Sequence, residues 1–358
     1  GNGMTFVVGG HGNLTLAGTL GSGQQASCLR TLNPSSRIDL RCSTLTNTVA
    51  GGTFSECVYT EVGTVFLEAE RIVNTPGSGV GSTAAIWWTD GTLRVEAKEI
   101  VQTTPAGVGV SAAILSDNFV AAVGDLTITA QSITGTVAAN TGSGGILNVT
   151  FNPEAKVWVE ANLISFDNVA CNVQGGKTYV TAQKLAGCTT SQGGTLGVIY
   201  ANGDNVDADT QLWLTAQKVT ATYERFILMT GGTVRATVPQ FEDLGGVVEA
   251  VNVSGGALTL TGTEIVIQSG SGVVISGGTV RLVKCRIDTS ANPSGFPVVV
   301  SGGTLILDGC TLVAAPGQDS IHAASPQTVT NYGSVATTAK NANVTVLVDA
   351  LTVDANVQ

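Results

Sequence analysis

The chain has little charge, little proline, few aromatic side chains and almost no histidine. Charged residues make up 12% of its 358 residues and aromatic residues 5%, with 9 prolines and 2 histidines. The chain has 16 basic and 26 acidic side chains, which gives a net charge of −10. Because nucleic-acid affinity comes mainly from cationic side chains that displace counterions, we expect no nucleic-acid partner.

Long apolar runs are also missing. No stretch approaches the roughly 20 apolar residues that a membrane helix needs, so we expect no membrane insertion. The first residues, GNGMTFVVGGHGN, lack the basic and apolar regions of a signal peptide. We therefore expect either a trimmed mature chain or assembly inside a cell.

The cysteines are odd in number, widely spaced and without a CxxC or CxxH pair, which favours neither zinc nor a dense disulfide framework. The seven are Cys28, Cys42, Cys57, Cys171, Cys188, Cys285 and Cys310. Assembly in a reducing cytoplasm fits this pattern better than secretion. The glycine-rich stretches near Gly77 and Gly270 lack the Gly-Lys-Ser/Thr ending of a phosphate loop, and we expect no cofactor.

Glycine and apolar residues are abundant. There are 46 glycines, and 43% of the chain is apolar, with valine, leucine, isoleucine and alanine interleaved with threonine. This mixture suits short strands and tight turns and is poor in the periodic Leu, Glu and Lys patterns of surface helices. The composition predicts an all-β protein.

A degenerate repeat organises the sequence. Three late segments align directly: GGALTLTGTEI from Gly255, GGTVRLVKCRI from Gly277 and GGTLILDGCTL from Gly302. Counting weaker matches, twelve copies begin at residues 13, 37, 64, 92, 125, 156, 177, 211, 233, 257, 279 and 304. Their spacing of 21 to 34 residues suits one turn of a three-sided solenoid with loops of variable length. We predict a right-handed, single-stranded parallel β-helix of about 12 rungs.

Each copy has the same internal pattern, counted from its first residue. Offsets 1, 3 and usually 8 are apolar, and offset 5 is small, as in Ala69, Ala161 and Gly262. Alternation sends offsets 1 and 3 into the core and offsets 2 and 4 outward, with a bend at offset 5. The Gly-Gly pairs predict a second corner with positive φ. A third strand is expected at residues 272–276 and 297–301.

The repeat defines three regions. Residues 1–12 are expected to form an N-terminal cap and residues 13–324 the β-helix. From about Ser325 the Gly-Gly corners are missing, although strand alternation continues. We interpret residues 325–358 as a C-terminal β cap or an oligomerisation segment, because a solenoid end exposes backbone groups that need cover.

Three aromatic residues occupy the outward offset 2 in consecutive copies: Trp158, Tyr179 and Trp213. Stacked turns would align them as a ladder, a surface suited to sugar rings or to another subunit. The simpler alternative is that these aromatic residues lie under a long loop or in a subunit interface.

Carboxylates offer weak catalytic candidates. A glycosidase needs two of them, roughly 5 to 9 Å apart. Glu96 beside Glu68 or Glu99 is one such candidate, and Glu160 with its neighbours is another. Because a repeat aligns such residues without selection for chemistry, the catalytic residues stay unknown.

Two further groups of residues are weaker candidates. Asp204, Asp207 and Asp209 in the loop NGDNVDADT suggest Ca²⁺, but the spacing is not that of an EF-hand, and a solvated turn is the simpler interpretation. We therefore predict no metal. His11 and His322 lie near the two ends without partners that suggest a triad or zinc site. Cys285 and Cys310 share one offset, which predicts stacked buried thiols, with a disulfide as an alternative.

The GGT-h-x-h repeats, the polar Thr/Ala/Gly insertions and the non-repeating β terminus resemble the β-helical tail-fibre and tailspike proteins of bacteriophages. The resemblance covers about residues 13–324 and rests on architecture. It implies a virion protein assembled in the host bacterial cytoplasm as a parallel homotrimer. Its implied partners are other virion proteins and host surface glycans. A polysaccharide-degrading β-helix enzyme (a glycoside hydrolase or lyase) and a bacterial surface adhesin are the alternatives.

Overall fold

The computed structural model describes residues 5–8, 10, 12–21, 23–105, 107–117, 124–138, 143–189, 196–203 and 210–357. These residues form strands and turns and contain no helix, which confirms the all-β prediction. Accordingly, the described ranges hold no helix that could cross a membrane.

The chain divides into two compact units, which we describe separately. Unit 1 comprises Gly1–Gln183 and Asn205–Asp209, and unit 2 comprises Lys184–Asp204 and Thr210–Gln358. The chain passes from unit 1 to unit 2 within strand β16 (Lys177–Gly187).

Unit 1 contains a major sheet of long strands and a minor sheet of shorter ones. The major-sheet strands before β16 are β1 (Thr5–Val8), β2 (Asn13–Leu16), β5 (Arg37–Asn47), β8 (Thr64–Asn74), β10 (Thr92–Gln102), β12 (Asp125–Gly135) and β14 (Lys156–Phe166). The minor-sheet strands are β4 (Gln25–Thr31), β7 (Phe54–Thr60), β9 (Ser82–Trp88), β11 (Val110–Ser116), β13 (Gly144–Asn148) and β15 (Cys171–Val173). A separate pair joins β3 (Thr19–Leu20) to β6 (Ala50–Gly51).

Unit 2 repeats this plan with shorter strands. After β16, its major-sheet strands are β18 (Gln211–Glu224), β20 (Thr233–Thr237), β21 (Gln240–Val247), β23 (Ala257–Thr261), β24 (Glu264–Val266), β26 (Thr279–Val283), β27 (Arg286–Asp288), β29 (Thr304–Asp308), β30 (Thr311–Val313), β32 (Gln327–Tyr332), β33 (Val335–Ala336), β34 (Val344–Val348) and β35 (Thr352–Val353). Its minor-sheet strands are β17 (Ile199–Ala201), β19 (Ile227–Met229), β22 (Glu249–Val253), β25 (Ser271–Ile275), β28 (Val298–Val300) and β31 (Ile321–His322).

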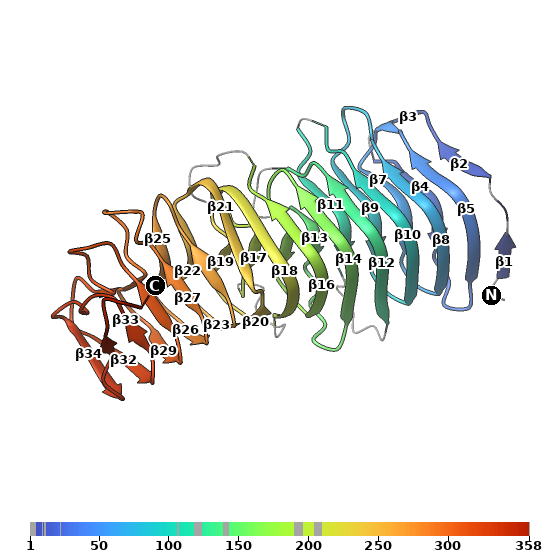
Figure 1. The fold of residues 1–358 in the computed structure, drawn as a ribbon. Coiled ribbons are helices and arrows are strands. Elements are labelled where there is room, and N and C mark those ends of the chain that lie inside the picture. The colour runs from blue at the N-terminus through green and yellow to red at the C-terminus, as the bar shows by residue number, and fades with distance from the viewer. Residues whose placement is uncertain are drawn as a thin grey trace. The chain divides into compact units, whose positions relative to one another are not determined.

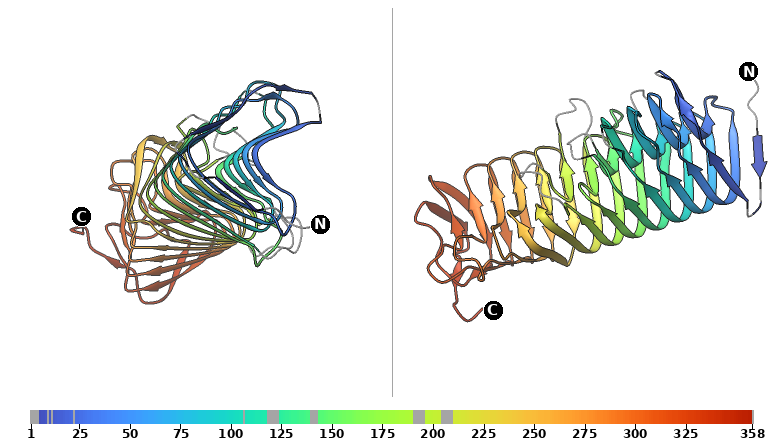
Figure 2. Two further views of the ribbon diagram at one scale, coloured as in Figure 1. Left: turned by 90° about the vertical axis from the view of Figure 1, so that its right-hand side faces the viewer. Right: turned by 90° about the horizontal axis from the view of Figure 1, so that it is seen from above.

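Each unit is a parallel β-helix, as predicted. In unit 1, β8 pairs with β10, β10 with β12 and β12 with β14, while β9 pairs with β11 and β11 with β13, all in parallel. The chain therefore alternates between the two sheets and returns beside its own previous strand at each turn (Figures 1 and 2). The handedness and the number of turns stay predictions.

Burial along the strands follows the predicted alternation. In β8, Val65 and Leu67 are buried whereas Phe66 is partly exposed and Glu68 exposed. In unit 2, Val280 and Leu282 of β26 are buried and Arg281 is exposed. The core is therefore the stack of offsets 1 and 3 from successive turns.

The predicted bend at offset 5 takes two forms. In unit 1 one long strand continues through it, and the pairing of β8 with β10 skips one residue between Ala69 and Arg71. In unit 2, β18 also runs through the bend, but from β23 onward the strand breaks in two and offset 5 has a left-handed backbone, with φ of 64° at Gly262 and 52° at Lys284. Successive turns of unit 2 thus show the predicted three strands, as in β23, β24 and β25.

The Gly-Gly corners have the predicted positive φ at their second residue. Gly278, with φ of 71°, stands directly on the previous turn, where an added Cβ would lie 2.5 Å from the Gly256 carbonyl oxygen. An L-residue is strained at this φ. An added Cβ would also occupy the space in which the two turns contact each other.

Amide side chains form an unexpected ladder inside unit 1. Asn47, Asn74 and Gln102 occupy the last position of their strands and are 0% exposed. The Asn74 side-chain nitrogen donates to Gln102 Oε1 at 2.9 Å and to Thr83 Oγ1 at 2.7 Å. The core at this corner is polar and hydrogen-bonded.

The first copy of the repeat was assigned to the wrong residues. Thr5, not Asn13, pairs with Arg37, and Asn13 pairs with Thr44 further along β5. Both TFVV and NLTL have apolar residues at their second and fourth positions. Only their pairing with β5 shows that TFVV lies beside its first half and NLTL beside its second. Whether residues 1–12 act as a cap stays a prediction.

Parallel pairing continues beyond Ser325. Strand β32 pairs with β29, and β34 pairs with β32. The role of residues 325–358 as a cap or oligomerisation segment stays a prediction.

We predict that Gly278→Ala destabilises the protein by about 2–6 kcal/mol, because it combines left-handed strain of roughly 1–3 kcal/mol with overpacking of similar size. Urea-induced unfolding followed by circular dichroism measures the loss. Gly317→Ala is the matched control, since Gly317 has φ of 85° but no atom within 4 Å of an added Cβ. Equal losses in the two variants would contradict the role assigned to contact between turns.

Candidate functional site

The outward face of the major sheet in unit 1 displays the predicted site residues. In β14, Val157 and Val159 are buried, whereas Trp158 is 42% exposed and Glu160 is also exposed. Trp158 lies in register with Thr127 of β12, which in turn lies in register with Arg94 of β10. The regular pairing therefore aligns offset 2 of successive turns in one column.

Two of the three predicted ladder aromatics contact each other. The rings of Trp158 and Tyr179 are stacked, with centroids 3.8 Å apart and an angle of 8° between their planes. Trp213 lies on β18 of unit 2, where the Arg235 guanidinium is 6.0 Å from the centroid of its ring. A ladder that includes Trp213 stays a prediction.

A shallow groove follows the bend of the major sheet beside this column. Its floor contains Cys42, Ala69 and Ala97, small residues that lie in register on β5, β8 and β10. Its walls carry the charged or polar side chains of Arg41, Glu68, Glu70, Glu96, Lys98 and Thr129. A small-residue floor between polar walls can admit an extended polar chain.

The carboxylates of this groove are paired with cations. Glu96 accepts from Arg94 at 2.6 Å, and Glu70 accepts from Lys98 at 2.7 Å. Glu68 contacts Arg41, and Glu99 accepts from Arg71 at 2.7 Å. All four pairs are exposed, so each adds at most about 1 kcal/mol to stability.

Glu160, the other catalytic candidate, has no carboxylate beside it on the neighbouring strand β12. It lies in register with Thr129, a hydroxyl residue. Glu96 and Glu68 are in register with each other, but each contacts an arginine. The described part of this face therefore offers contacts for a ligand more readily than an acid and base pair.

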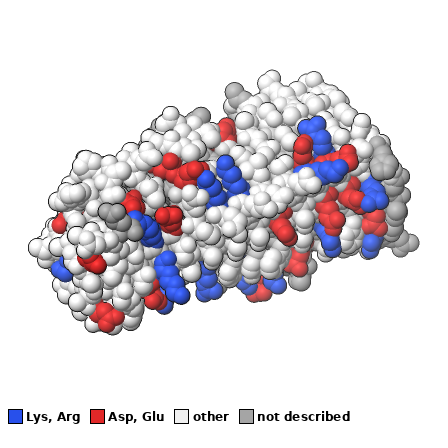
Figure 3. All heavy atoms as spheres, in the orientation of Figure 1, with Lys and Arg blue, Asp and Glu red and all other residues white. Residues whose placement is uncertain are grey.

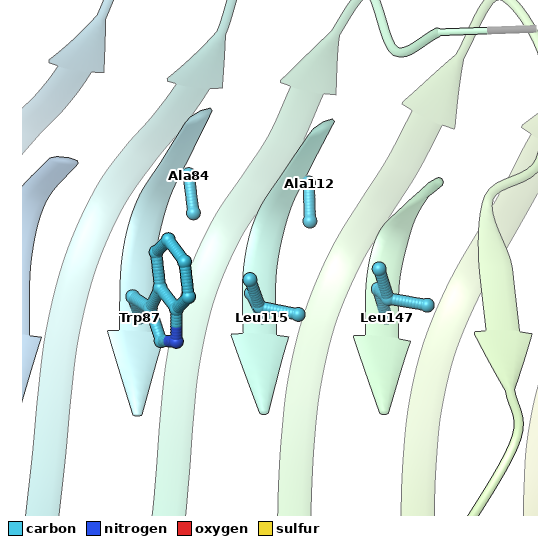
Figure 4. Close-up of a cluster of buried hydrophobic side chains, with 5 residues drawn as sticks. All are labelled: Ala84, Trp87, Ala112, Leu115 and Leu147. Carbon is cyan, nitrogen blue, oxygen red and sulfur yellow. The ribbon is translucent and has the colours of Figure 1, made fainter. Parts of the chain in front are cut away.

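A second cluster, which the sequence analysis missed, lies on the minor sheet of unit 1. Its buried members are Ala84, Trp87, Ala112, Leu115 and Leu147, drawn in Figure 4 on three neighbouring strands. Phe54 and Tyr59 meet the Trp87 ring edge to face, with centroids 4.9 and 5.9 Å away.

A polar network borders this cluster. Trp87 Nε1 donates to Asp117 Oδ1 at 2.7 Å, and the Thr89 hydroxyl donates to the same oxygen at 3.2 Å. Burial raises the pKa of Asp117 to about 6, although both hydrogen bonds oppose that rise. The Arg30 guanidinium covers the Tyr59 ring at 5.0 Å.

Glu56 on β7 is the most deeply buried carboxylate of this region. It is 0% exposed, and burial raises its pKa to about 7. Gln25 donates a hydrogen bond to Oε1, while Oε2 has no partner. The side chain therefore holds a proton at a pH at which an exposed glutamate is ionised.

Glu56 and Asp117 cannot act as a glycosidase pair. Glu56 lies in register with Ala84, and Ala84 with Ala112, whereas Asp117 follows the end of β11. At about 3.3 Å per residue, the distance along the strand alone is roughly 15 Å. Glycosidase carboxyl groups lie within about 9.5 Å of each other.

The prediction of no metal is not tested at its candidate residues. Asp204, Asp207, Asp209 and His11 lie outside the described residues. Within the described ranges, no group of three or more His, Cys, Asp or Glu side chains could hold a metal ion. His322 Nδ1 lies 2.9 Å from Asp319 Oδ2, and its ring stacks on Phe296 with centroids 4.2 Å apart.

A sequence signal for the minor-sheet cluster does exist. The segments STAAIWW from Ser82 and VSAAILS from Val110 share an Ala-Ala-Ile core and the same burial pattern. This second repeated motif marks the minor strand, as the Gly-Gly motif marks the major one.

Comparison with known proteins gives no relative: no family model matches the chain, and neither a curated protein nor a solved structure matches it.

We predict that Glu56 makes stability fall as the pH rises. Its pKa is higher in the folded chain, about 7, than the ordinary 4.5. The folded state therefore binds the proton more tightly, and this contribution is complete below about pH 4.5 and is lost towards pH 7. The loss is about 3 kcal/mol. Urea unfolding at a series of pH values measures it.

In Glu56→Gln, the free energy of unfolding should lose the part of its pH dependence that comes from Glu56. The part that comes from Asp117 should remain. Glu154→Gln, which changes a glutamate whose side chain is 76% exposed, is the matched control and should behave as the unchanged protein. A Glu56→Gln profile that parallels the unchanged one would show that Glu56 is ionised in the folded chain.

Proposed function

We propose that the chain is a structural protein of a bacteriophage virion, similar to a tail fibre or tailspike, that contacts glycans of the host cell surface. The observation that carries the proposal is the Trp158–Tyr179 stack, with Trp158 42% exposed on a regular outward face. A large aromatic ring left open to water on a rigid sheet is typical of a contact surface.

The chemistry beside the stack suits a saccharide. Aromatic faces pack against the C–H faces of sugar rings, and polar side chains bind the hydroxyl groups. Glu160 and Thr181 are exposed two residues after Trp158 and Tyr179. The groove with its floor at Ala69 and Ala97 supplies further polar walls in unit 1.

Binding without cleavage is the function that the geometry supports best. The carboxylates of the groove contact arginine or lysine. Glu160 lies beside Thr129 of the neighbouring strand β12. A polysaccharide-degrading enzyme and a bacterial surface adhesin remain the alternatives.

The virion part of the proposal includes a homotrimer that assembles in the host bacterial cytoplasm and joins other virion proteins. Free thiols at all seven cysteines support assembly in a reducing compartment. Apolar residues exposed in the last strands of unit 2 support a contact between subunits: Tyr332, Leu347, Val348 and Val353.

We predict that Trp158→Ala and Tyr179→Ala each weaken binding to purified bacterial surface polysaccharide by about tenfold, the equivalent of roughly 1.4 kcal/mol of stacking. Isothermal titration calorimetry against lipopolysaccharide and capsular fractions measures the change. Tyr223→Ala, which removes an aromatic side chain that is 40% exposed on β18 of unit 2, is the control and should bind normally.

Chromatography of the same polysaccharide after incubation should show unchanged chain length, also with Glu160→Gln. Shortened chains that depend on Glu160 or Glu96 would favour the enzyme instead. Absence of binding by the unchanged protein to every fraction would remove the glycan proposal.

We predict a solution mass of three times the 36.2 kDa chain, because the proposed virion protein is a homotrimer. Light scattering coupled to size-exclusion chromatography measures it. Leu347→Asp with Val348→Asp should shift the mass towards one chain if the exposed residues of β34 form the contact. A monomeric unchanged protein would contradict the trimer.

A further inference from the structure

Cys28 and Cys57 face each other across the minor sheet of unit 1. Their neighbours are in parallel register, Ser27 with Glu56 and Leu29 with Val58, which places the two cysteines side by side on β4 and β7. The Cys28 thiol donates to the Thr46 carbonyl oxygen and the Cys57 thiol to the Val73 carbonyl oxygen, each at 3.3 Å. Adjacent parallel strands lie about 4.8 Å apart, within the range of Cα separations that a disulfide bridges.

The two thiols differ in accessibility. Cys28 is partly exposed, whereas Cys57 is 0% exposed. The neighbouring Cys57 thiol lowers the pKa of Cys28, and burial raises that of Cys57. An accessible thiol with thiolate character next to a buried partner is the arrangement that reacts first with an oxidant and is then resolved.

The remaining cysteines lack this combination. Cys42 is 8% exposed, and burial raises its pKa. The other four are less exposed still. Cys171 and Cys188 are almost completely buried, and burial raises the pKa of each to about 12. Cys285 and Cys310 lie side by side in unit 2, as predicted, and their thiols donate to the Leu260 and Leu282 carbonyl oxygens, but they are only 2% and 1% exposed. A reagent in solution can therefore reach Cys28 before any of these four.

We propose that Cys28 and Cys57 are a reversible thiol–disulfide site, oxidised by a small-molecule disulfide such as oxidised glutathione. The proposal goes beyond the proposed glycan contact and does not depend on it.

The reaction proceeds by two exchanges. The Cys28 thiolate attacks one sulfur of glutathione disulfide, forms a mixed disulfide and releases one glutathione thiolate. Cys57 then gives up its proton and attacks the Cys28 sulfur, which forms the protein disulfide and releases the second glutathione. Two protein thiols are oxidised by two electrons, one disulfide is reduced to two thiols, and both protons end on glutathione.

The disulfide would fix the edge strand β4 of the minor sheet to its neighbour β7. The described part of the minor sheet in unit 1 ends at β4, which pairs there only with β7. Edge strands open more readily than central ones. A covalent link at Cys28 therefore joins the strand that separates first to the strand that supports it.

The test uses the full chain in oxidised glutathione, followed by acid quench, alkylation, digestion and mass spectrometry. We expect a peptide that links Cys28 to Cys57 in most molecules, with Cys171 and Cys188 alkylated. Amide exchange in β4 should slow by about tenfold in the oxidised chain. Cys171→Ser is the control and should give the same linked peptide.

Cys57→Ser separates the two steps, because it should stop at the mixed disulfide on Cys28. If this variant does not fold, native maleimide labelling of the unchanged chain replaces it, and Cys28 should react at least tenfold faster than Cys171. Oxidation that leaves Cys28 free, or that leaves only a mixed disulfide in the unchanged chain, would overturn the proposal. Neither readout uses polysaccharide binding.

Discussion

Parallel hydrogen bonding of each turn onto the previous one is the constraint on which this structure depends. A single turn buries its apolar side chains only when another turn lies directly above it in the same register. Offsets 1 and 3 in β8, β10, β12 and β14 keep this register over four strands. The same pairing aligns outward residues, so a surface column such as Phe66, Arg94, Thr127 and Trp158 is a consequence of the core.

This coupling explains the character of the outer surface. On the face drawn in Figure 3, basic and acidic side chains lie next to each other and form no large patch of one sign. Pairs such as Glu70 with Lys98 and Arg281 with Asp308 join neighbouring turns. Among the acidic residues that look like catalytic candidates in the sequence, Glu68 and Glu99 form such pairs, and Glu96 pairs with Arg94 on its own strand. The exposed aromatic stack at Trp158 differs from this background.

The fold was predictable because one period repeats: offsets 1 and 3, the small bend residue and the Gly-Gly corner each have a local physical cause. The first copy was not, because TFVV and NLTL carry equal alternation and only long-range pairing separates them. The stacking of Trp158 on Tyr179 followed from their shared offset. The environments of Glu56 and Asp117 did not, because their burial depends on Gln25, Trp87 and Thr89 from other turns.

The amide ladder inside unit 1 acts as a check on how the turns are aligned. A shift of two residues along a strand would keep apolar side chains on the inner face, so the apolar pattern alone does not exclude it. The Asn74 side-chain nitrogen, by contrast, reaches Thr83 Oγ1 and Gln102 Oε1 only in their present places, while Asn74 Oδ1 has no partner. A chain that stacked two residues out of step would keep these amides buried but take their donors away from the present acceptors, at roughly 1–3 kcal/mol each. The ladder thus penalises the misaligned coils that a degenerate repeat would otherwise permit.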